Sequence, residues 1–267
     1  MKQKDFYKDL RVLSIGNSFS VDTMTHMASV ARSAGVENLR LGNLFVGGCS
    51  IRRHYAHATE DAHVYKYYTN DGTGWESTPD VSIREAIESD TWDWISIQHG
   101  TGDGSRYTAP ESYEHLPALI AYVKALAPNA RIAFNMTWVW EPDSSHHEMR
   151  SYEGDTEAFY RNLTALTATL ARETAGLDRI SPTGTAVQNL RTATSVTLTR
   201  DRFHLSGGLG RYVAALTFLH ALTGIGIEDV SWLPEGVTEE EGAFARAAAI
   251  AAVKTPFELT DLSKSSS

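Results

Sequence analysis

The sequence is poor in cysteine and in long apolar runs. Cys49 is the single cysteine among 267 residues, which excludes an intramolecular disulfide and a metal site built on cysteines. No apolar run approaches the roughly 20 residues that a membrane-spanning helix requires, and residues 1–6 lack the apolar core of a secretory signal peptide. We therefore expect a cytoplasmic protein without membrane contacts; a signal peptide removed from a precursor would leave no mark on this sequence.

Positive charge is also scarce. The chain carries 24 lysine and arginine residues against 33 aspartate and glutamate residues, a formal net charge of −9. Nucleic-acid binding requires a basic surface, so we expect no nucleic-acid partner. Hydrophobic residues make up 42% of the chain and charged residues 21%. This composition is typical of a globular domain with enough apolar material for a core.

Short apolar segments alternate with helical patterns along the chain. The segments predicted as strands are residues 10–15, 38–46, 94–98, 131–137 and 179–181. The segments predicted as helices are residues 21–34, 51–62, 82–88, 110–126, 152–174, 182–192, 208–222 and 239–253. Such alternation indicates an α/β fold, a three-layer α/β/α sandwich with a central five-stranded parallel sheet. Because no internal repeat or linker divides it, we predict a single domain over residues 1–262, followed by a disordered tail at residues 263–267.

An insertion interrupts this alternation near residues 64–78. A tyrosine-rich run precedes the turn residues Asp71 and Gly72, and a second short run follows them. An Asp-Gly pair between two such runs is typical of a β-hairpin. We therefore predict an inserted hairpin whose tyrosines, Tyr65, Tyr67 and Tyr68, offer a surface for substrate or for a second subunit, so that the chain could form a homo-oligomer.

A serine follows the first predicted strand directly. The apolar run ends in Gly16-Asn17-Ser18, and the helical pattern starts three residues later. In open α/β folds, binding crevices lie at the carboxyl edge of the sheet, and a helix N-terminus at that edge favours developing negative charge. Ser18 is therefore a candidate nucleophile. The simpler interpretation, a serine that only caps the helix, is favoured by the local sequence alone.

Two candidate partners for this serine lie near the end of the chain. A serine hydroxyl is a weak nucleophile unless an adjacent base removes its proton. An imidazole can serve as that base, and a carboxylate bonded to its other nitrogen holds the required tautomer. Asp201 and His204, three residues apart in one predicted loop, provide these groups. Taken alone, this common spacing favours a capping aspartate and a packed histidine.

The early serine block and the late Asp-x-x-His block together resemble the SGNH hydrolases, also called the GDSL lipase and esterase superfamily. The sequence resembles the branch known as domain of unknown function 4886 more closely still. The blocks that carry this resemblance are Ser14-Ile15-Gly16-Asn17-Ser18-Phe19-Ser20, Leu41-Gly42-Asn43-Leu44, Gly47-Gly48-Cys49-Ser50, Thr137-Trp138, Pro182-Thr183-Gly184-Thr185-Ala186-Val187-Gln188-Asn189, Arg200-Asp201 and His204-Leu205-Ser206. The resemblance spans roughly residues 12–224 and implies the SGNH/flavodoxin-like form of the sandwich.

The resemblance implies a catalytic role for three residues. Ser18 is the expected nucleophile, His204 the general base and then the general acid, and Asp201 the residue that orients His204. With all three present, the resemblance reverses the preference for a serine that only caps the helix.

The resemblance also implies an oxyanion hole. The family forms it from the N–H of the serine itself, here Ser18, from a glycine N–H in the second block and from an Asn side chain in the third. The glycine corresponds to Gly48, with Gly47 as the near alternative. The third-block Asn is absent, and we expect the amide of Gln98 to replace it. Asn17 stands where the family usually has Asp, which we expect to change local hydrogen bonding rather than the chemistry.

Three further residues are candidates for substrate binding. Trp138 and Trp140 could stack on a sugar ring or could pack in the core. His99 could contact substrate, although a loop histidine is more often structural. His146 and His147 beside an acidic residue are a weak metal candidate, because adjacent histidines point apart on a helix or strand. We therefore expect neither a metal nor a cofactor.

The resemblance implies a serine esterase that acts through an acyl-enzyme. It suggests small acyl groups, above all acetyl, carried on a carbohydrate, so the expected partner is a small-molecule or oligosaccharide ester. Two alternatives remain open from the sequence. One is a lipase or thioesterase for longer acyl chains, and the other is a carbohydrate-binding relative with weak catalysis.

Overall fold

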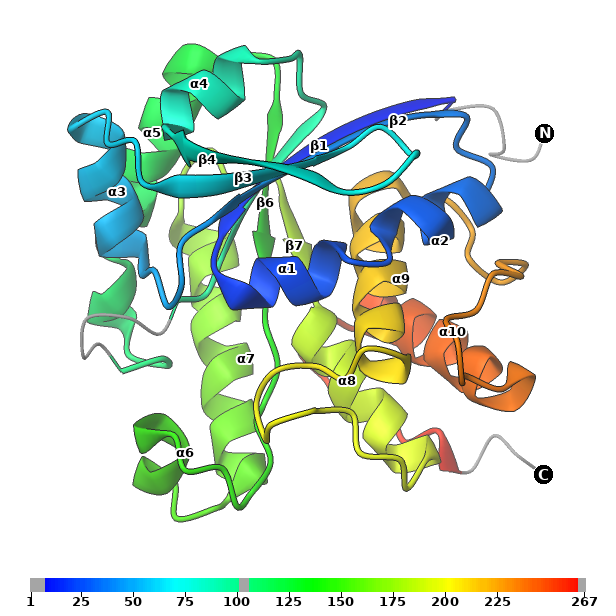
Figure 1. Ribbon diagram of the computed structural model, residues 1–267. Helices are drawn as coiled ribbons and strands as arrows, with labels where there is room; N and C mark the ends of the chain where they lie inside the picture. Colours follow the sequence, from blue (N-terminus) through cyan, green and yellow to red (C-terminus); the bar gives the residue numbers. More distant parts are fainter. Residues whose placement is uncertain (1–7, 101–105, 264–267) are drawn as a thin grey trace.

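The computed structural model describes residues 8–100 and 106–263 and shows a seven-stranded sheet between two layers of helices (Figure 1). The strands are β1 (Asp9–Gly16), β2 (Asn38–Phe45), β3 (Tyr65–Asn70), β4 (Glu76–Val81), β5 (Trp94–Gln98), β6 (Arg131–Asn135) and β7 (Arg179–Ser181). The α-helices are α1 (Ser18–Met24), α2 (Met27–Ser33), α3 (Ile51–Thr59), α4 (Ile83–Glu88), α5 (Leu116–Leu126), α6 (His147–Ser151), α7 (Thr156–Glu173), α8 (Thr183–Ala193), α9 (Leu209–Thr223) and α10 (Glu239–Lys254). The predicted three-layer α/β/α fold is confirmed.

The sheet order is β4-β3-β2-β1-β5-β6-β7. Its five adjacent strands β2, β1, β5, β6 and β7 run parallel to one another. These are the five strands that the sequence predicts. The central ones are buried on both faces, as β5 shows with every residue buried, and such strands have nearly continuous apolar sequences. The order reverses between β1 and β5, so the carboxyl end of β1 lies at the switch point where open α/β sheets form their sites.

The predicted hairpin is present, but it belongs to the sheet. Strand β3 pairs antiparallel with β2, with Tyr68 opposite Asn43, and β4 pairs antiparallel with β3. The hairpin therefore extends the sheet at one edge instead of projecting from it. Strand β4 forms the outer edge, and its residues are mostly exposed.

The sheet divides the apolar core in two. Along β1, Leu10 and Val12 face one cluster, whereas Leu13 and Ile15 face the other. Helices α3, α4 and α5 cover the second cluster, and α1, α2, α8, α9 and α10 cover the first (Figure 1). Helix α9 is apolar on nearly every side because the sheet, α8 and α10 enclose it.

The segment predicted as one helix over residues 21–34 is two helices. Helix α1 begins at Ser18, earlier than predicted, and the chain bends between α1 and α2. At the bend, the Trp75 indole N–H donates to the Thr25 carbonyl at 3.3 Å, and the His26 ring contacts the Gly207 carbonyl oxygen at 2.6 Å. Both partners are distant in sequence, so tertiary contacts account for a break that local pattern does not predict.

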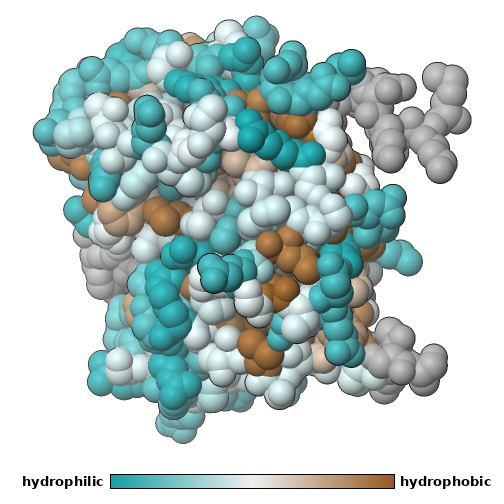
Figure 2. Space-filling model, turned by 45° about the vertical axis from the view of Figure 1, so that its right-hand side comes forward, coloured by the Kyte–Doolittle hydropathy of each residue, from teal (hydrophilic) through white to brown (hydrophobic). Residues whose placement is uncertain are grey.

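The surface carries few large apolar side chains. Figure 2 shows one face on which hydrophilic residues surround small, separate apolar groups. Over residues 8–100 and 106–263, the large hydrophobic side chains that are exposed are those of Val64, Val196 and Leu259. None of the helices described has both the length and the apolar content of a membrane span. Apart from Ser263, the predicted tail at residues 263–267 lies outside the described residues.

Candidate active site

The turn between β1 and α1 presents Ser18 at the carboxyl edge of the sheet. The N-cap of α1 is Asn17, whose Oδ1 accepts the Phe19 N–H at 3.0 Å, and Ser18 is the first helical residue. The interpretation of Ser18 as the cap is therefore wrong, and its hydroxyl is available for other contacts. Gly16 allows this tight turn, because a Cβ there would lie 2.6 Å from the Ser20 side chain.

The loop before α9 brings the two predicted partners to this serine. His204 Nε2 lies 2.8 Å from Ser18 Oγ, and His204 Nδ1 lies 2.7 Å from Asp201 Oδ2. Because a carboxylate can only accept, Nδ1–H donates to Asp201, and Nε2 is left to accept the Ser18 hydroxyl proton. The three residues thus form the hydrogen-bonded chain that serine catalysis requires.

The Asp201 carboxylate has a second task inside its own loop. Its Oδ1 accepts the His204 N–H at 2.8 Å and the Phe203 N–H at 3.4 Å, which forms a local Asx turn. Partial burial acts to raise the pKa of Asp201, but the hydrogen bonds from the ring and backbone of His204 outweigh it, and the pKa lies below its usual value. Asp201 therefore remains an ionised acceptor for the histidine.

The loop that carries Asp201 and His204 is closed by backbone contacts. The Arg200 N–H donates to the His204 carbonyl at 2.9 Å, and the Ser206 N–H donates to the Leu198 carbonyl at 2.8 Å. Arg202, at the tip, has a positive φ of 75°, a conformation that is uncommon for a residue other than glycine. The surrounding hydrogen bonds hold the loop in this shape.

Two backbone N–H groups near Ser18 are candidates for the oxyanion hole. The Ser18 N–H is the first of α1, and the first N–H groups of a helix have no intrahelical acceptor. Gly48 lies in the loop after β2 with a φ of 59°, and apart from its chain neighbours no described atom lies within 4 Å of the position that a Cβ would take there. Asn17 Nδ2 donates to the Cys49 carbonyl at 3.1 Å, so this loop is tied to the nucleophile turn.

The amide of Gln98 bonds to neighbouring protein groups. Its Nε2 donates to Asn17 Oδ1 at 2.7 Å and lies 3.4 Å from the His99 carbonyl oxygen. Both amide hydrogens are therefore used inside the protein, and the side chain is only 2% exposed. The prediction that Gln98 supplies the third oxyanion donor is wrong for this geometry. Gln98 instead supports Asn17, and through it the turn that carries Ser18.

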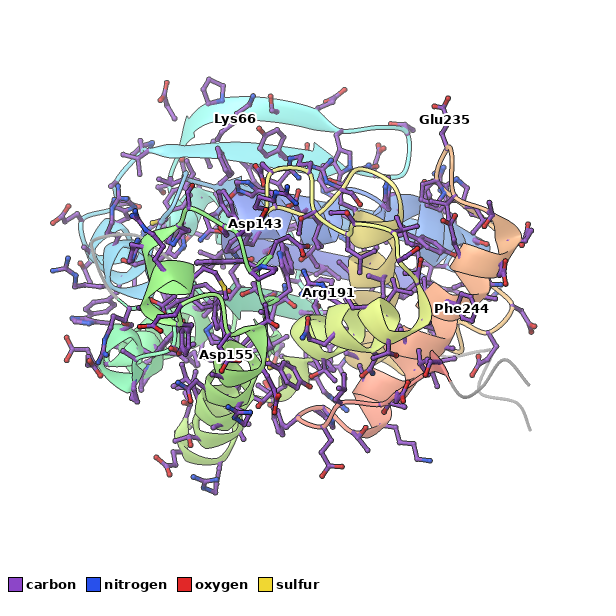
Figure 3. All side chains as sticks on the ribbon, turned by 90° about the horizontal axis from the view of Figure 1, so that it is seen from below. Lys66, Asp143, Asp155, Arg191, Glu235 and Phe244 are labelled. Atoms are coloured by element: carbon purple, nitrogen blue, oxygen red, sulfur yellow. The ribbon has the colours of Figure 1, made fainter. Side chains whose placement is uncertain are left out.

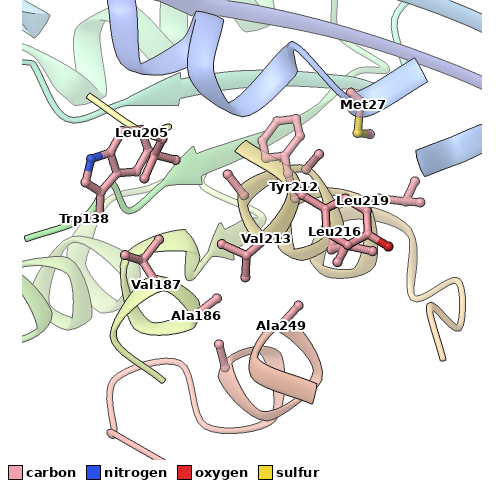
Figure 4. Close-up of a cluster of buried hydrophobic side chains, with 14 of the residues drawn as sticks. Met27, Trp138, Ala186, Val187, Leu205, Tyr212, Val213, Leu216, Leu219 and Ala249 are labelled. Atoms are coloured by element: carbon pink, nitrogen blue, oxygen red, sulfur yellow. The ribbon is translucent and has the colours of Figure 1, made fainter. Parts of the chain in front are cut away.

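The structure also contradicts the three predicted substrate contacts. Trp138, Trp140 and His99 are all fully buried. The indole N–H of Trp138 donates to the Phe203 carbonyl at 2.6 Å, and Figure 4 draws Trp138 in the same buried cluster as Leu205. Trp138 therefore supports the loop of His204 from behind. The faces of the Trp138 ring pack inside the protein, so this tryptophan belongs to the core and does not stack on a sugar.

His99 and Trp140 are parts of the core as well. The ring of His99 bonds to the Tyr113 hydroxyl at 2.5 Å and to the Thr167 hydroxyl at 3.1 Å, and burial lowers the pKa of His99 to about 3. It is therefore neutral at physiological pH. The ring of Trp140 packs edge-on against Phe159. The rest of the glycine-rich segment after His99, residues 101–105, lies outside the described residues.

A second set of contacts holds the segment that leads into the His204 loop. Arg191 of α8 donates to Glu141 Oε1 at 2.8 Å and to the Val139 carbonyl at 2.9 Å, and Thr199 Oγ1 donates to the same carboxylate oxygen at 3.0 Å. Asp143 pairs with Arg202 at 3.1 Å. Arg191 and Asp143 both lie near the middle of the view in Figure 3. Arg191 thus pairs with a carboxylate and ties the segment of Val139 and Glu141 to α8.

No metal ligand set is found in the part of the chain that the structure describes. Within residues 8–100 and 106–263, no group of three or more His, Cys, Asp or Glu residues could hold a metal ion. His146 caps α6, its ring contacts that of Trp140, and desolvation lowers its pKa to about 4. Cys49 is buried, so its thiol is shielded from solvent.

Sequence reasoning missed Asp22. This carboxylate stands on α1 one turn after Ser18, is fully buried, and accepts the Leu205 N–H at 2.8 Å. The available signal was an acidic residue one turn after the candidate nucleophile, in the same short helix. Its partners, however, are about 180 residues away in the chain.

The strand order and the helical layers give the chain the fold found in solved GDSL-like hydrolases. The chain belongs to the family described as domain of unknown function (DUF4886), whose family model matches residues 11–252. It is similar to the crystal structure of a DUF4886 family protein from Bacteroides uniformis, with a TM-score of 0.89 and 29% sequence identity. That match covers 96% of this chain and 98% of the other.

Two more distant structures share the fold. Axe2, an acetylxylan esterase from Geobacillus stearothermophilus, gives a TM-score of 0.51 at 17% identity and covers 85% of this chain and 96% of its own. A protein assigned to the GDSL-like lipases, from Parabacteroides merdae, gives 0.53 at 16% identity and covers 84% and 100%. The search of curated proteins returned no match for the chain.

Proposed function

We propose that the protein is a serine carboxylic-ester hydrolase. The observation that carries this proposal is the continuous chain from Ser18 Oγ through the His204 ring to Asp201, with links of 2.8 and 2.7 Å. The helix N-terminus behind Ser18 adds a place where negative charge is favoured. A nucleophile hydrogen-bonded to a base, which is hydrogen-bonded to an orienting carboxylate, is the arrangement that catalyses acyl transfer.

The reaction follows from this arrangement. Ser18 Oγ attacks the ester carbonyl carbon while His204 Nε2 takes the hydroxyl proton, and the N–H groups of Ser18 and Gly48 stabilise the oxyanion. The bond to the alcohol oxygen then breaks, and His204 gives its proton to that oxygen. Water attacks the acyl-enzyme with His204 as base, releases the acid and restores Ser18. Asp201 stabilises the imidazolium in both halves.

We take acetyl esters of carbohydrates as the first substrate class to test. Support comes from the resemblance of the sequence blocks to the SGNH hydrolases, and from the fold shared with an acetylxylan esterase. The 17% identity carries the fold alone, so the substrate is part of the proposal. Acetylated xylo-oligosaccharides are the direct test, with release of acetate as the readout; no release at any concentration would contradict a carbohydrate substrate.

The chemistry itself is tested with a small aryl acetate. We expect turnover by the wild type, loss of at least about 10³-fold in Ser18→Ala, and covalent labelling of Ser18 by a fluorophosphonate probe. Full activity in Ser18→Ala would overturn the proposed nucleophile. An unlabelled, inactive wild type would favour a binding protein related to esterases.

A second candidate is an esterase for acyl chains somewhat longer than acetyl, and the observation behind it is a small apolar cavity beside α1. Its volume is about 120 Å³, and it is lined by Val21, Met24, Thr25, Asn43, Tyr68 and Trp75. Val21 lies three residues after Ser18 on the same helix. In this second proposal the cavity, whose lining does not include the triad, receives the acyl chain of an ester held at Ser18. Drug-sized ligands need roughly 300–1,000 Å³, so only a short chain fits.

An acyl-chain series separates the two candidates. Aryl acetate, butyrate and octanoate are compared in the wild type and in Val21→Phe, which fills the cavity. If the cavity takes the acyl chain, the variant loses butyrate activity relative to acetate. Val196→Phe, at a residue that is 43% exposed, is the matched control. If the wild type prefers acetate over butyrate and Val21→Phe has the same ratio of the two activities, the protein is better described as an acetylesterase.

A further inference from the structure

Asp22 is a buried carboxylate that the proposed catalytic chain does not use. It lies on α1, four residues after Ser18, and its side chain has no exposed surface. Residues four apart on a helix share one side and are separated by about 6 Å along its axis. Ser18 and Asp22 are therefore held at a constant spacing by one short rigid element.

The two oxygens of Asp22 bind the loop of the catalytic histidine. Oδ2 accepts the Leu205 N–H at 2.8 Å, immediately after His204. Oδ1 accepts from Arg200 Nη1 at 2.9 Å, immediately before Asp201. The same guanidinium of Arg200 also donates to the Leu205 carbonyl. Asp22 therefore binds both ends of the segment that contains Asp201 and His204.

A second arginine completes this cluster. Arg211 on α9 donates to Asp22 Oδ1 through Nε at 2.9 Å and pairs through Nη2 at 2.7 Å. A buried carboxylate needs such partners, because an unpaired charge in the interior is very costly. Replacing a whole buried ion pair by apolar residues is often neutral or stabilising. Net stability therefore explains this cluster poorly, and a role in orientation explains it better.

We propose that Asp22 is a positioning residue that sets the approach of His204 to Ser18. The contacts form a closed ring: Ser18, one turn of α1, Asp22, the Leu205 N–H, His204, and back to Ser18 Oγ at 2.8 Å. If Asp22 moves, or if its bond to the Leu205 N–H is lost, this closed set of contacts is broken beside His204. Misplacement of a catalytic group by about 1 Å can reduce turnover about 10²-fold. The inference rests on the proposed esterase function.

The position of Asp22 is tested with two variants and a matched control. Asp22→Ala removes both acceptors, whereas Asp22→Asn keeps the shape and one acceptor oxygen. Glu148→Gln is the control, because Glu148 is also a buried carboxylate, and it accepts backbone N–H groups from Tyr107 and Thr108, away from the triad. All are compared by kcat and KM on an aryl acetate at a temperature where each is folded by circular dichroism.

We expect kcat to fall about 10²-fold in Asp22→Ala with KM changed less than about threefold, partial recovery of kcat in Asp22→Asn, and an unchanged kcat in Glu148→Gln. A merely structural role would lower the melting temperature in all three and leave kcat of the folded fraction intact. That result would overturn the inference while the loss of activity in Ser18→Ala still supported the esterase.

A crystal structure of Asp22→Ala tests the inference without activity. We expect the distance between Ser18 Oγ and His204 Nε2 to exceed hydrogen-bond range. A distance still near 2.8 Å would overturn the positioning role, even if the wild type hydrolysed none of the esters tried.

Discussion

Asn17 shows how one polar side chain can organise an active-site turn. Its Oδ1 accepts from the Phe19 N–H and from Gln98 Nε2, and its Nδ2 donates to the Cys49 carbonyl. An aspartate could accept the first two bonds but could not donate the third. The Asn17 amide therefore links the ends of three strands. Its bond to the Cys49 carbonyl is the change in local hydrogen bonding that we expect from Asn in place of Asp.

Replacing Asn17 by alanine should therefore destabilise the protein. Loss of the helix cap costs about 1 kcal/mol, and the buried Gln98 N–H left without its acceptor costs about 1–3 kcal/mol more. We expect the free energy of unfolding of Asn17→Ala to fall by about 2–4 kcal/mol in urea titrations. Asn38→Ala, which removes an exposed bond to Asp9, should change it by less than about 0.5 kcal/mol. Equal effects would contradict this account.

The pKa of Asp201 gives a pH dependence with a definite sign. Because it is lower in the folded protein than its usual value, the carboxylate contributes stability above its unfolded pKa of about 3.9 and loses it as pH falls through the folded pKa. The stability that wild type holds over Asp201→Asn should therefore be present at pH 5 and shrink below about pH 4. A difference that vanished already near pH 6 would point to another group.

At the scale of elements, the segment from Leu198 to Ser206 is a short loop held from three sides. Asp22 of α1 binds it from one side, the Trp138 indole from a second, and the Glu141 N–H donates to the Arg202 carbonyl at 2.8 Å. Each contact restrains a different point of the loop. His204 is thus placed by elements that follow β1 and β6, and the loop alone does not determine its position.

The two tryptophans after β6 provide a matched test of this support. Trp138→Phe keeps most of the packing but removes the hydrogen bond to the Phe203 carbonyl, so we expect kcat to fall about tenfold with KM for a sugar ester unchanged. Trp140→Phe is the control, since its buried indole nitrogen has no hydrogen-bond partner among the described residues. A raised KM with an unchanged kcat in Trp138→Phe would instead indicate contact with the sugar.

At the scale of the whole molecule, the hairpin changes the edge of the sheet. Association through this hairpin is still a prediction, but the outer strand β4 carries Glu76, Pro79 and Asp80. A proline has no N–H to donate, and charged residues on an edge disfavour pairing with another strand. We therefore expect no continuous sheet between copies, and a light-scattering mass above the 29.4 kDa of one chain would come from a contact outside the β4 edge. A stable dimer that Pro79→Thr strengthens would show that the edge is used.

The sequence by itself determined the features that depend on neighbours along the chain. The five parallel strands follow from apolar segments, and the Asp201 turn follows from contacts within three residues. Only the tertiary structure decided what Asp22, Gln98 and Trp138 do, because their partners lie 183, 81 and 65 residues away. A side chain's burial and hydrogen-bond partner depend on which distant elements meet it. Local pattern therefore offered Ser18 and His204 only as candidates, and the family resemblance supplied their expected roles. Neither could identify the distant residues that hold them together.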